Sequence, residues 1–233
     1  MCEQVSIDYF SDTLCVWAYI SEIRLEELTQ NFGSHVKISR HFMPTFGCTE
    51  KRIGQGWANK GGYAGFSDHI YSVSKAYTHI NVRPDLWTKT RPTTSTTSHL
   101  FLKAVQLLQN KGIIAHQAST STDVRSPFES ISWQIRRAFF ERALDISNLK
   151  VLRQLGIEAD LPISEIDKLM ETGEAHAALA ADTELRDQYH LQGSPSYILN
   201  EGRQILFGNV GYKIIEVNVQ EILKQPENQL SWC

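Results

Sequence analysis

Residues 5–20 read VSIDYFSDTLCVWAYI, and the spacing of the apolar side chains changes within them. Up to Phe10 the apolar residues alternate with period two, which predicts a half-buried strand. Over residues 17–32 the apolar residues follow a mostly helical spacing, and Gly33 is a helix stop signal. Residues 36–42 alternate again. We therefore predict a strand–helix–strand unit with parallel strands and a right-handed crossover.

The rest of the chain is a long helical block with a strand-rich end. Neither end of the chain could cover both faces of a sheet alone. We therefore predict one α/β domain, formed by residues 1–44 and 191–233, that is interrupted by an all-helical insertion domain at residues 45–190. Inside the insertion the spacing of apolar residues predicts helices at residues 66–77, 97–110, 133–143, 147–155 and 164–191. After it, strands are expected at residues 196–199 and 204–207 and a last helix at residues 214–223.

The composition excludes several classes of protein. The 233 residues are 42% hydrophobic and 21% charged, which is typical of a globular protein and excludes disordered and collagen-like chains. With 26 acidic and 23 basic residues the net charge is -3, and no Lys/Arg cluster interrupts it, so we expect no nucleic-acid partner. No run approaches the roughly 20 apolar residues that span a bilayer, and the first strand leaves no room for a leader. We expect no membrane contact and a cytoplasmic location.

Nothing in the sequence indicates a metal ion or a nucleotide. The four cysteines lie at positions 2, 15, 48 and 233, far apart, so we expect neither a zinc site nor a disulfide framework. The glycines of residues 54–65 follow no strand and precede no P-loop lysine, which favours a mobile loop over a phosphate cradle. His41, His99 and His116 belong to no acidic or cysteine motif, and we assign them no chemistry.

Cys15 is the residue with the clearest chemical potential. It lies where the first strand gives way to a helix, and the positive end of a helix dipole favours a thiolate. This placement predicts a reactive cysteine whose pKa lies below the free-thiol value of about 8.5. The alternative is a small buried side chain, because free cysteines are often buried.

Three segments of the chain resemble DsbA-like thioredoxin-fold proteins. In that family the first strand ends in Asp-x-x-Cys-Pro-Trp-Cys-Tyr, and residues 12–19 here read Asp-Thr-Leu-Cys-Val-Trp-Ala-Tyr. Residues 185–200 resemble the family's helix, Gly-x-Pro-Thr turn and strand, and residues 138–156 resemble the insertion of its cytoplasmic branch. Kappa-class glutathione transferases and 2-hydroxychromene-2-carboxylate isomerases are related to that branch. The resemblance implies a thioredoxin fold interrupted by a helical insertion.

The resemblance also implies roles for individual residues. Cys15 is expected to be catalytic, and Trp17, Ser194 and Pro195 to bind substrate, with Pro195 in a cis peptide bond beside the cysteine. Glutathione is expected as a co-substrate. The related glutathione enzymes carry Phe-Gly-x-Asp-Arg after the last strand, whose Asp meets the γ-glutamyl group, whereas residues 207–211 here read Phe-Gly-Asn-Val-Gly and lack that carboxylate. Asn209 is the nearby polar residue. It either hydrogen-bonds a ligand or is an ordinary turn residue.

Ala18 is the main departure from the family, because it replaces the second cysteine of C-x-x-C. A C-x-x-C exchange cycle is therefore excluded, whereas a lone thiolate can still exchange with glutathione. Cys48 follows the second strand and is the best candidate for a resolving thiol. We predict a thiol–disulfide oxidoreductase that acts through a single cysteine. The alternatives are a glutathione-dependent isomerase or transferase of small molecules and a non-catalytic binding module. The expected partners are thiols, disulfides, glutathione or a small molecule, with a homodimer left open.

Overall fold

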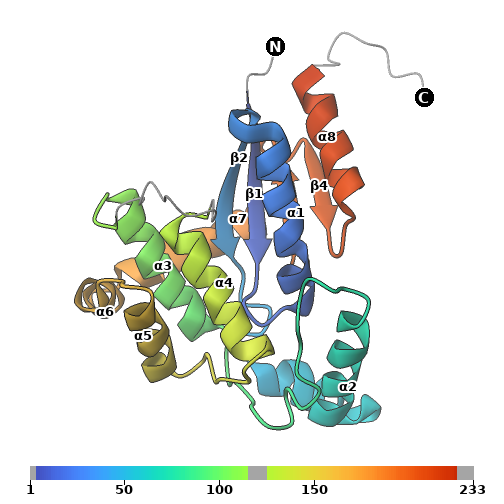
Figure 1. The fold of residues 1–233 in the computed structure, drawn as a ribbon, viewed down its shortest axis with the longest axis vertical. Helices are drawn as coiled ribbons and strands as arrows, with labels where there is room; N and C mark the ends of the chain where they lie inside the picture. Colours follow the sequence, from blue (N-terminus) through green and yellow to red (C-terminus); the bar gives the residue numbers. More distant parts are fainter. Residues whose placement is uncertain (1–3, 115–124, 225–233) are drawn as a thin grey trace.

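The computed structural model describes residues 4–114 and 125–224, which are built around a four-stranded mixed sheet (Figure 1). The strands pair in the order β2-β1-β3-β4, with β1 and β2 parallel and the other neighbours antiparallel. The four strands expected from the sequence are therefore confirmed, and they join both ends of the chain into one sheet. Their bounds are β1 (Val5–Ser11), β2 (Val36–Phe42), β3 (Ser196–Leu199) and β4 (Gln204–Phe207).

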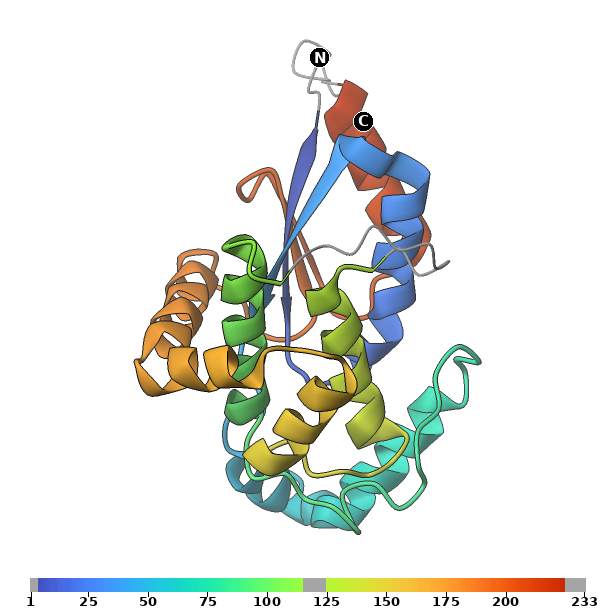
Figure 2. The ribbon, with the colours of Figure 1, turned by 60° about the vertical axis from the view of Figure 1, so that its left-hand side comes forward.

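Helices cover both faces of this sheet. α1 (Val16–Phe32) and α8 (Tyr212–Lys224) lie on one face, and α7 (Glu174–Gln188) lies across the other (Figure 2). The alternation in β1 explains these layers. Ile7 clusters with residues of α1 and α8, whereas Phe10 clusters with Ile198 and with side chains at the end of α7.

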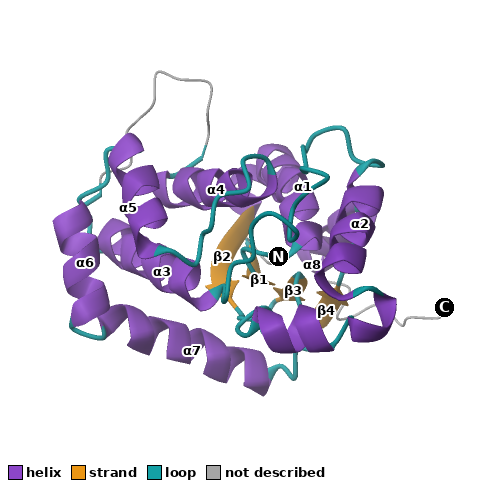
Figure 3. Cartoon of the chain, turned by 90° about the horizontal axis from the view of Figure 1, so that it is seen from below, coloured by secondary structure: helices purple, strands orange, loops and turns teal. Residues whose placement is uncertain are grey.

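The helical block lies mainly beside β2 (Figure 3). Its helix α2 (Gly62–Ser74) lies on the opposite side of the sheet, near β4 (Figure 3). Its other helices before α7 are α3 (Thr96–Asn110), α4 (Pro127–Phe140), α5 (Leu149–Glu158) and α6 (Ile163–Glu171). α4 begins earlier than the predicted residue 133, because Ser126 and Glu129 form a capping box and a proline occupies the first turn. Within residues 4–114 and 125–224, no helix has the length and apolar character that crossing a membrane requires.

Two predictions about this block are wrong. The single helix expected at residues 164–191 is two helices, α6 and α7, because Gly173 adopts a left-handed conformation with φ of 86° between them. The glycine-rich residues, expected to form a loop, are largely helical. They include part of a π-helix, Glu50–Gln55, a further helical turn at Ala58–Lys60 and the start of α2.

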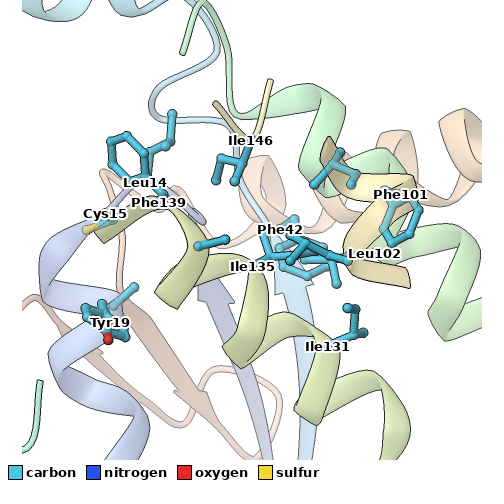
Figure 4. Close-up of a cluster of buried hydrophobic side chains, with 14 of the residues drawn as sticks. Leu14, Cys15, Tyr19, Phe42, Phe101, Leu102, Ile131, Ile135, Phe139 and Ile146 are labelled. Atoms are coloured by element: carbon cyan, nitrogen blue, oxygen red, sulfur yellow. The ribbon is translucent and has the colours of Figure 1, made fainter. Parts of the chain in front are cut away.

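The helical block and the sheet share one hydrophobic core. Leu14 and Tyr19, from the β1–α1 side, cluster with Phe139 of α4 and Phe101 of α3, and the same cluster contains Cys15 (Figure 4). A second cluster lies between the sheet and helices α1 and α8. The helices are thus inserted in sequence but continuous with the sheet in packing. The boundaries at residues 44 and 190 remain a prediction.

Candidate active site

Cys15 immediately precedes α1 and closes the turn that joins β1 to that helix. Its backbone is extended, with φ of -83° and ψ of 116°. The Cys15 N–H donates to the Asp12 carbonyl at 3.1 Å, and the Cys15 carbonyl accepts the N–H of Tyr19 at 3.1 Å. The thiol therefore stands at the N-terminus of a 17-residue helix, where the sequence places it.

Ser194 and Pro195 lie beside this thiol, although they are distant in sequence. The Ser194–Pro195 peptide bond is cis. The Cys15 S–H donates to the Ser194 carbonyl, with 3.2 Å between Sγ and O. The Ser194 hydroxyl in turn accepts the Asp12 N–H at 2.9 Å. The structure thus brings together the cysteine and the cis-proline turn that the family resemblance associates with it.

The ionisation of Cys15 differs from the expectation based on the helix dipole. The residue is only 5% exposed, and this burial raises the pKa of the thiol above its ordinary value. The Ser194 side chain and the backbone N–H groups of Ala18 and Trp17 favour the thiolate, whereas the Asp12 charge opposes it. The predicted pKa below the free-thiol value is therefore wrong, because desolvation outweighs the helix N-terminus. The resting thiol is protonated and acts as a donor.

A buried carboxylate, Asp12, holds the turn that carries Cys15. Asp12 is fully buried. Its Oδ1 accepts the N–H of Leu14 at 2.8 Å, and its Oδ2 accepts the N–H of Phe46 at 2.9 Å and the Ser95 hydroxyl at 2.7 Å. One side chain therefore ties the Cys15 turn to the loop after β2 and to the start of α3. Asp12 belongs to the family motif at residues 12–19, but this role was not predicted from the sequence.

Arg136 of α4 reaches the same turn from the helical block. Its Nη1 donates to the Asp12 carbonyl at 2.8 Å, and its Nη2 donates to the Ser11 hydroxyl at 3.0 Å. Arg136 is almost completely buried, so its charge needs polar partners, and these are the Asp12 carbonyl and the Ser11 hydroxyl. Arg136 and the Asp12 carboxylate thus support the same turn through different atoms. Arg136 was not predicted from the sequence, because nothing local marks one arginine of a helix as buried.

His99 of α3 lies below the turn and is neutral. Its Nε2 accepts the N–H of Thr13 at 3.2 Å, and its ring stacks on Phe42. Burial lowers the pKa of His99 to about 4, although the charge of Asp12, whose Oδ1 is 3.8 Å from Nε2, works against this shift. An imidazole that accepts a backbone N–H must be unprotonated at that nitrogen. His99 is therefore a structural acceptor under the Cys15 turn.

Trp17 and Asn209, both expected at the site, are joined by a residue that the sequence did not indicate. The ring of Tyr77, which follows α2, meets the Trp17 ring edge to face, with centroids 6.4 Å apart. Asn209 donates from Nδ2 to the Tyr77 hydroxyl at 2.7 Å. The helical block thus contacts both the first turn of α1 and the loop after β4. No local sequence signal distinguishes Tyr77 from other surface tyrosines.

Cys48 differs from Cys15 in its exposure to solvent. It lies in the loop after β2 and is exposed, and both cysteines are free thiols. The other two cysteines, at positions 2 and 233, lie outside the described residues. The resolving role of Cys48 remains a prediction.

The predictions for His41, for His116 and for metal binding concern residues other than Cys15 and its neighbours. The prediction that His41 has no acidic partner is wrong. Its Nδ1 lies 2.8 Å from Asp182 and its Nε2 lies 3.1 Å from Asp8. His116 lies outside the described residues. Among the residues that the structure describes, no group of three or more His, Cys, Asp or Glu side chains is placed to hold a metal ion.

A cavity of about 570 Å³ lies along β2, between α3 and α4. Charged side chains line it, including Lys37, Arg40, Lys103 and Glu129. None of the expected site residues belongs to its lining. This cavity is therefore separate from the surroundings of Cys15.

The sequence matches the family of DSBA-like thioredoxin domains over residues 6–220. The chain belongs to this family, whose thioredoxin fold with a helical insertion the sequence predicted. None of the curated proteins compared with the chain matches it.

Solved structures share the fold at low sequence identity. A candidate protein disulfide isomerase from Nitrosomonas europaea is 16% identical, with a TM-score of 0.71 and coverage of 96% of this chain and 99% of that one. The cytosolic disulfide reductase DsbM from Pseudomonas aeruginosa, solved with GSH, is 16% identical, with a TM-score of 0.63 and coverage of 92% and 99%. A 2-hydroxychromene-2-carboxylate isomerase is 13% identical, with a TM-score of 0.58 and coverage of 97% and 100%. At these identities the likeness establishes the fold alone.

Proposed function

We propose that the protein is a thiol–disulfide oxidoreductase that acts through Cys15 alone. The observation that carries this proposal is the 3.2 Å contact between the Cys15 sulfur and the Ser194 carbonyl, at the N-terminus of α1. A carbonyl at this place can accept an N–H of an extended ligand while the ligand's sulfur approaches Cys15. Ala18 leaves no second thiol one helical turn away, so the thiol that completes the reaction comes from outside this turn.

The protonated resting state suggests how a ligand activates the thiol. A ligand N–H that binds the Ser194 carbonyl competes with the Cys15 S–H for the same acceptor. The donors that remain, which are the Ser194 hydroxyl and the N–H groups of Trp17 and Ala18, favour the thiolate. Cys15 is then deprotonated only when a ligand is bound. This arrangement would spare the thiol from unspecific oxidation.

The proposed substrate is a mixed disulfide of glutathione with a peptide or small thiol. The Cys15 thiolate attacks the glutathione sulfur, so a Cys15–glutathione disulfide forms, the original S–S bond breaks, and the substrate leaves as a thiolate that takes up a proton. A second glutathione thiolate attacks this disulfide and releases Cys15 together with glutathione disulfide. The net reaction consumes one external glutathione and converts the mixed disulfide into the substrate thiol and glutathione disulfide. Cys48 is the internal alternative to the second glutathione.

The second candidate function is a glutathione-dependent isomerase or transferase of small molecules. The donor state of Cys15 favours it, because a protonated thiol can hydrogen-bond the thiolate of bound glutathione without attacking it. The likeness to a 2-hydroxychromene-2-carboxylate isomerase agrees with this candidate in fold. The third candidate, a non-catalytic binding module, requires a ligand but no covalent step. We place all three in the cytoplasm, in keeping with the cytosolic DsbM of the same fold.

Peptide mapping by mass spectrometry separates these candidates. The protein is incubated with glutathione disulfide, quenched in acid and digested, and each cysteine is inspected for a glutathione adduct. If the protein is an oxidoreductase, we expect an adduct on Cys15 that also forms in a Cys48→Ser variant and is released by reduced glutathione. If it is an isomerase, we expect no adduct on Cys15. Turnover of the small molecule should then persist in Cys15→Ser, since a hydroxyl is also a hydrogen-bond donor. A binding module predicts neither an adduct nor turnover.

A further inference from the structure

The two edges of the sheet are protected to different degrees. An edge strand presents unpaired N–H and C=O groups that can pair with another chain, and proteins usually protect such edges with charged residues, proline or a covering element. β2 carries Lys37, Arg40 and His41. Its outward groups are also partly bound, since Gln106 donates to the Arg40 carbonyl at 3.0 Å and the Phe42 N–H donates to Asp182 at 2.8 Å.

Among the residues that the structure describes, none of these protections is found along β4. Its sequence, Gln-Ile-Leu-Phe, contains neither a charged residue nor a proline. Ile205 is 46% exposed and Phe207 is 58% exposed, and they point to the same face because they are two residues apart in a strand. On the other face, α8 exposes Ile214 and Val217. The face of β4 that carries Ile205 and Phe207 is therefore apolar and exposed.

The backbone of β4 has hydrogen-bonding groups that point away from β3 at the same two residues. The Gly208 N–H donates to the Pro195 carbonyl at 2.9 Å, and Tyr197 is the partner of Leu206 in the antiparallel register. Because hydrogen-bonded pairs alternate along an antiparallel ladder, Leu206 bonds to β3. The N–H and C=O groups of Ile205 and Phe207 consequently point away from the sheet.

We infer that β4 is the interface of a homodimer, in which it pairs antiparallel with β4 of a second copy. A two-fold axis through Leu206 sets Ile205 opposite Phe207 of the second copy and Phe207 opposite its Ile205. Both pairs are hydrogen-bonded in this register, and each isoleucine packs against a phenylalanine on the same face. The edge thus complements itself, as an interface with two-fold symmetry requires. No like charges meet along β4, since the strand has none.

This interface would lie next to the proposed active site. A Cβ placed on Gly193, the residue before Ser194, would lie 3.2 Å from the Phe207 ring. Asn209 is only two residues beyond Phe207. The dimer would therefore fix the loops on either side of β4 in both copies. The inference itself does not depend on the proposed reaction.

Sedimentation velocity on the full chain, in reducing buffer to exclude intermolecular disulfides, tests the inference. The expected result is a dimer of the 26.5 kDa chain for the native sequence. Phe207→Lys should weaken the dimer at least about tenfold, because a charge on the edge opposes pairing. Ile157→Lys is the matched control: Ile157 is 57% exposed on α5, far from β4 in sequence, and its substitution should leave the dimer intact.

A second variant covers the case in which Phe207→Lys fails to fold. Ile205→Pro removes an N–H that points away from β3, so the monomer loses no ladder bond while the dimer loses one on each side of the axis. It should also dissociate the dimer, with the circular dichroism of the monomer unchanged. A monomeric native protein at about 100 μM, or a dimer that survives Ile205→Pro and Phe207→Lys alike, would overturn the inference.

Discussion

Cys15 and Cys48 follow neighbouring parallel strands, yet the fold treats the two thiols in opposite ways. Cys15 is buried, donates to the Ser194 carbonyl and lies in a turn held by Asp12. Cys48 is exposed in the loop after β2. Both cysteines follow the carboxyl ends of their strands, at the same end of the sheet, and they differ in the contacts that surround them. Placement at a strand end therefore does not by itself define a reactive cysteine.

The difference shows what a helix N-terminus contributes when the thiol beside it is buried. The N–H groups at the start of α1 favour the Cys15 thiolate, and burial nevertheless raises its pKa. Loss of water outweighs a favourable dipole because the dipole supplies only partial charges. The proposed function accounts for this protonated thiol by its activation when a ligand binds. The predictions below test how far the two cysteines differ.

The largest expected effect concerns the network under Cys15. Asp12→Ala leaves the Ser95 hydroxyl and the N–H groups of Phe46 and Leu14 without their acceptor. A buried donor that loses its partner costs about 1–3 kcal/mol, so the three together should cost about 3–5 kcal/mol. Urea unfolding should show a loss of this size. Cys48→Ala, at the exposed thiol, should change the free energy of unfolding by less than about 0.5 kcal/mol. Equal effects would show that the Cys15 turn is not specially held.

A smaller effect is expected from pH. Burial lowers the pKa of His99 to about 4 in the folded state, whereas an unfolded histidine titrates near 6.5. Between these values the unfolded chain binds more protons, so His99 makes the protein less stable as the pH falls from about 6.5 to 4. The loss is on the order of 3 kcal/mol. His99→Gln keeps an acceptor for the Thr13 N–H and should remove this part of the pH dependence.

His41 provides a control, because its contribution to stability should change with pH in the opposite direction. Burial tends to lower its pKa, but the hydrogen bonds to Asp182 and Asp8 raise it above the ordinary value. His41 therefore contributes stability at pH values below about 6.5, and this contribution is lost as the pH rises through its folded pKa. His41→Gln should lower stability more at pH 5 than at pH 8. A His99→Gln variant whose pH profile matches the native one would contradict the buried neutral state of His99.

The smallest predicted effect is on alkylation. In the folded protein without ligand, iodoacetamide should modify Cys48 more than about tenfold faster than Cys15, because Cys15 is buried and protonated. In urea the two rates should approach each other. Mass spectrometry of the peptides that carry each cysteine gives both rates in one sample. If Cys15 instead reacts first at mildly acidic pH, Cys15 is a thiolate, as the sequence predicted, and the protonated resting state is contradicted.

Local sequence patterns predicted most of the sheet and the place of Cys15, whereas contacts between distant segments escaped them. The strands were found because β1 and β2 alternate in polarity, and the cis-proline turn was found through family resemblance. Arg136, His99 and Tyr77 were missed because their roles depend on which helix faces the Cys15 turn. The pKa of Cys15 was misjudged for the same reason, since burial arises from packing against α4 and is invisible in the local sequence.

Turnover of a glutathionylated peptide tests the central claim most directly. The rate of peptide release by reduced glutathione is measured for two variants: one in which positions 2, 48 and 233 are serine, so that Cys15 is the sole cysteine, and one that carries only Cys15→Ser. We predict that the first variant retains the native rate within about twofold and that the second falls to the uncatalysed rate. Catalysis that persists in Cys15→Ser, or that disappears when Cys15 is the only cysteine, would contradict a single-cysteine mechanism.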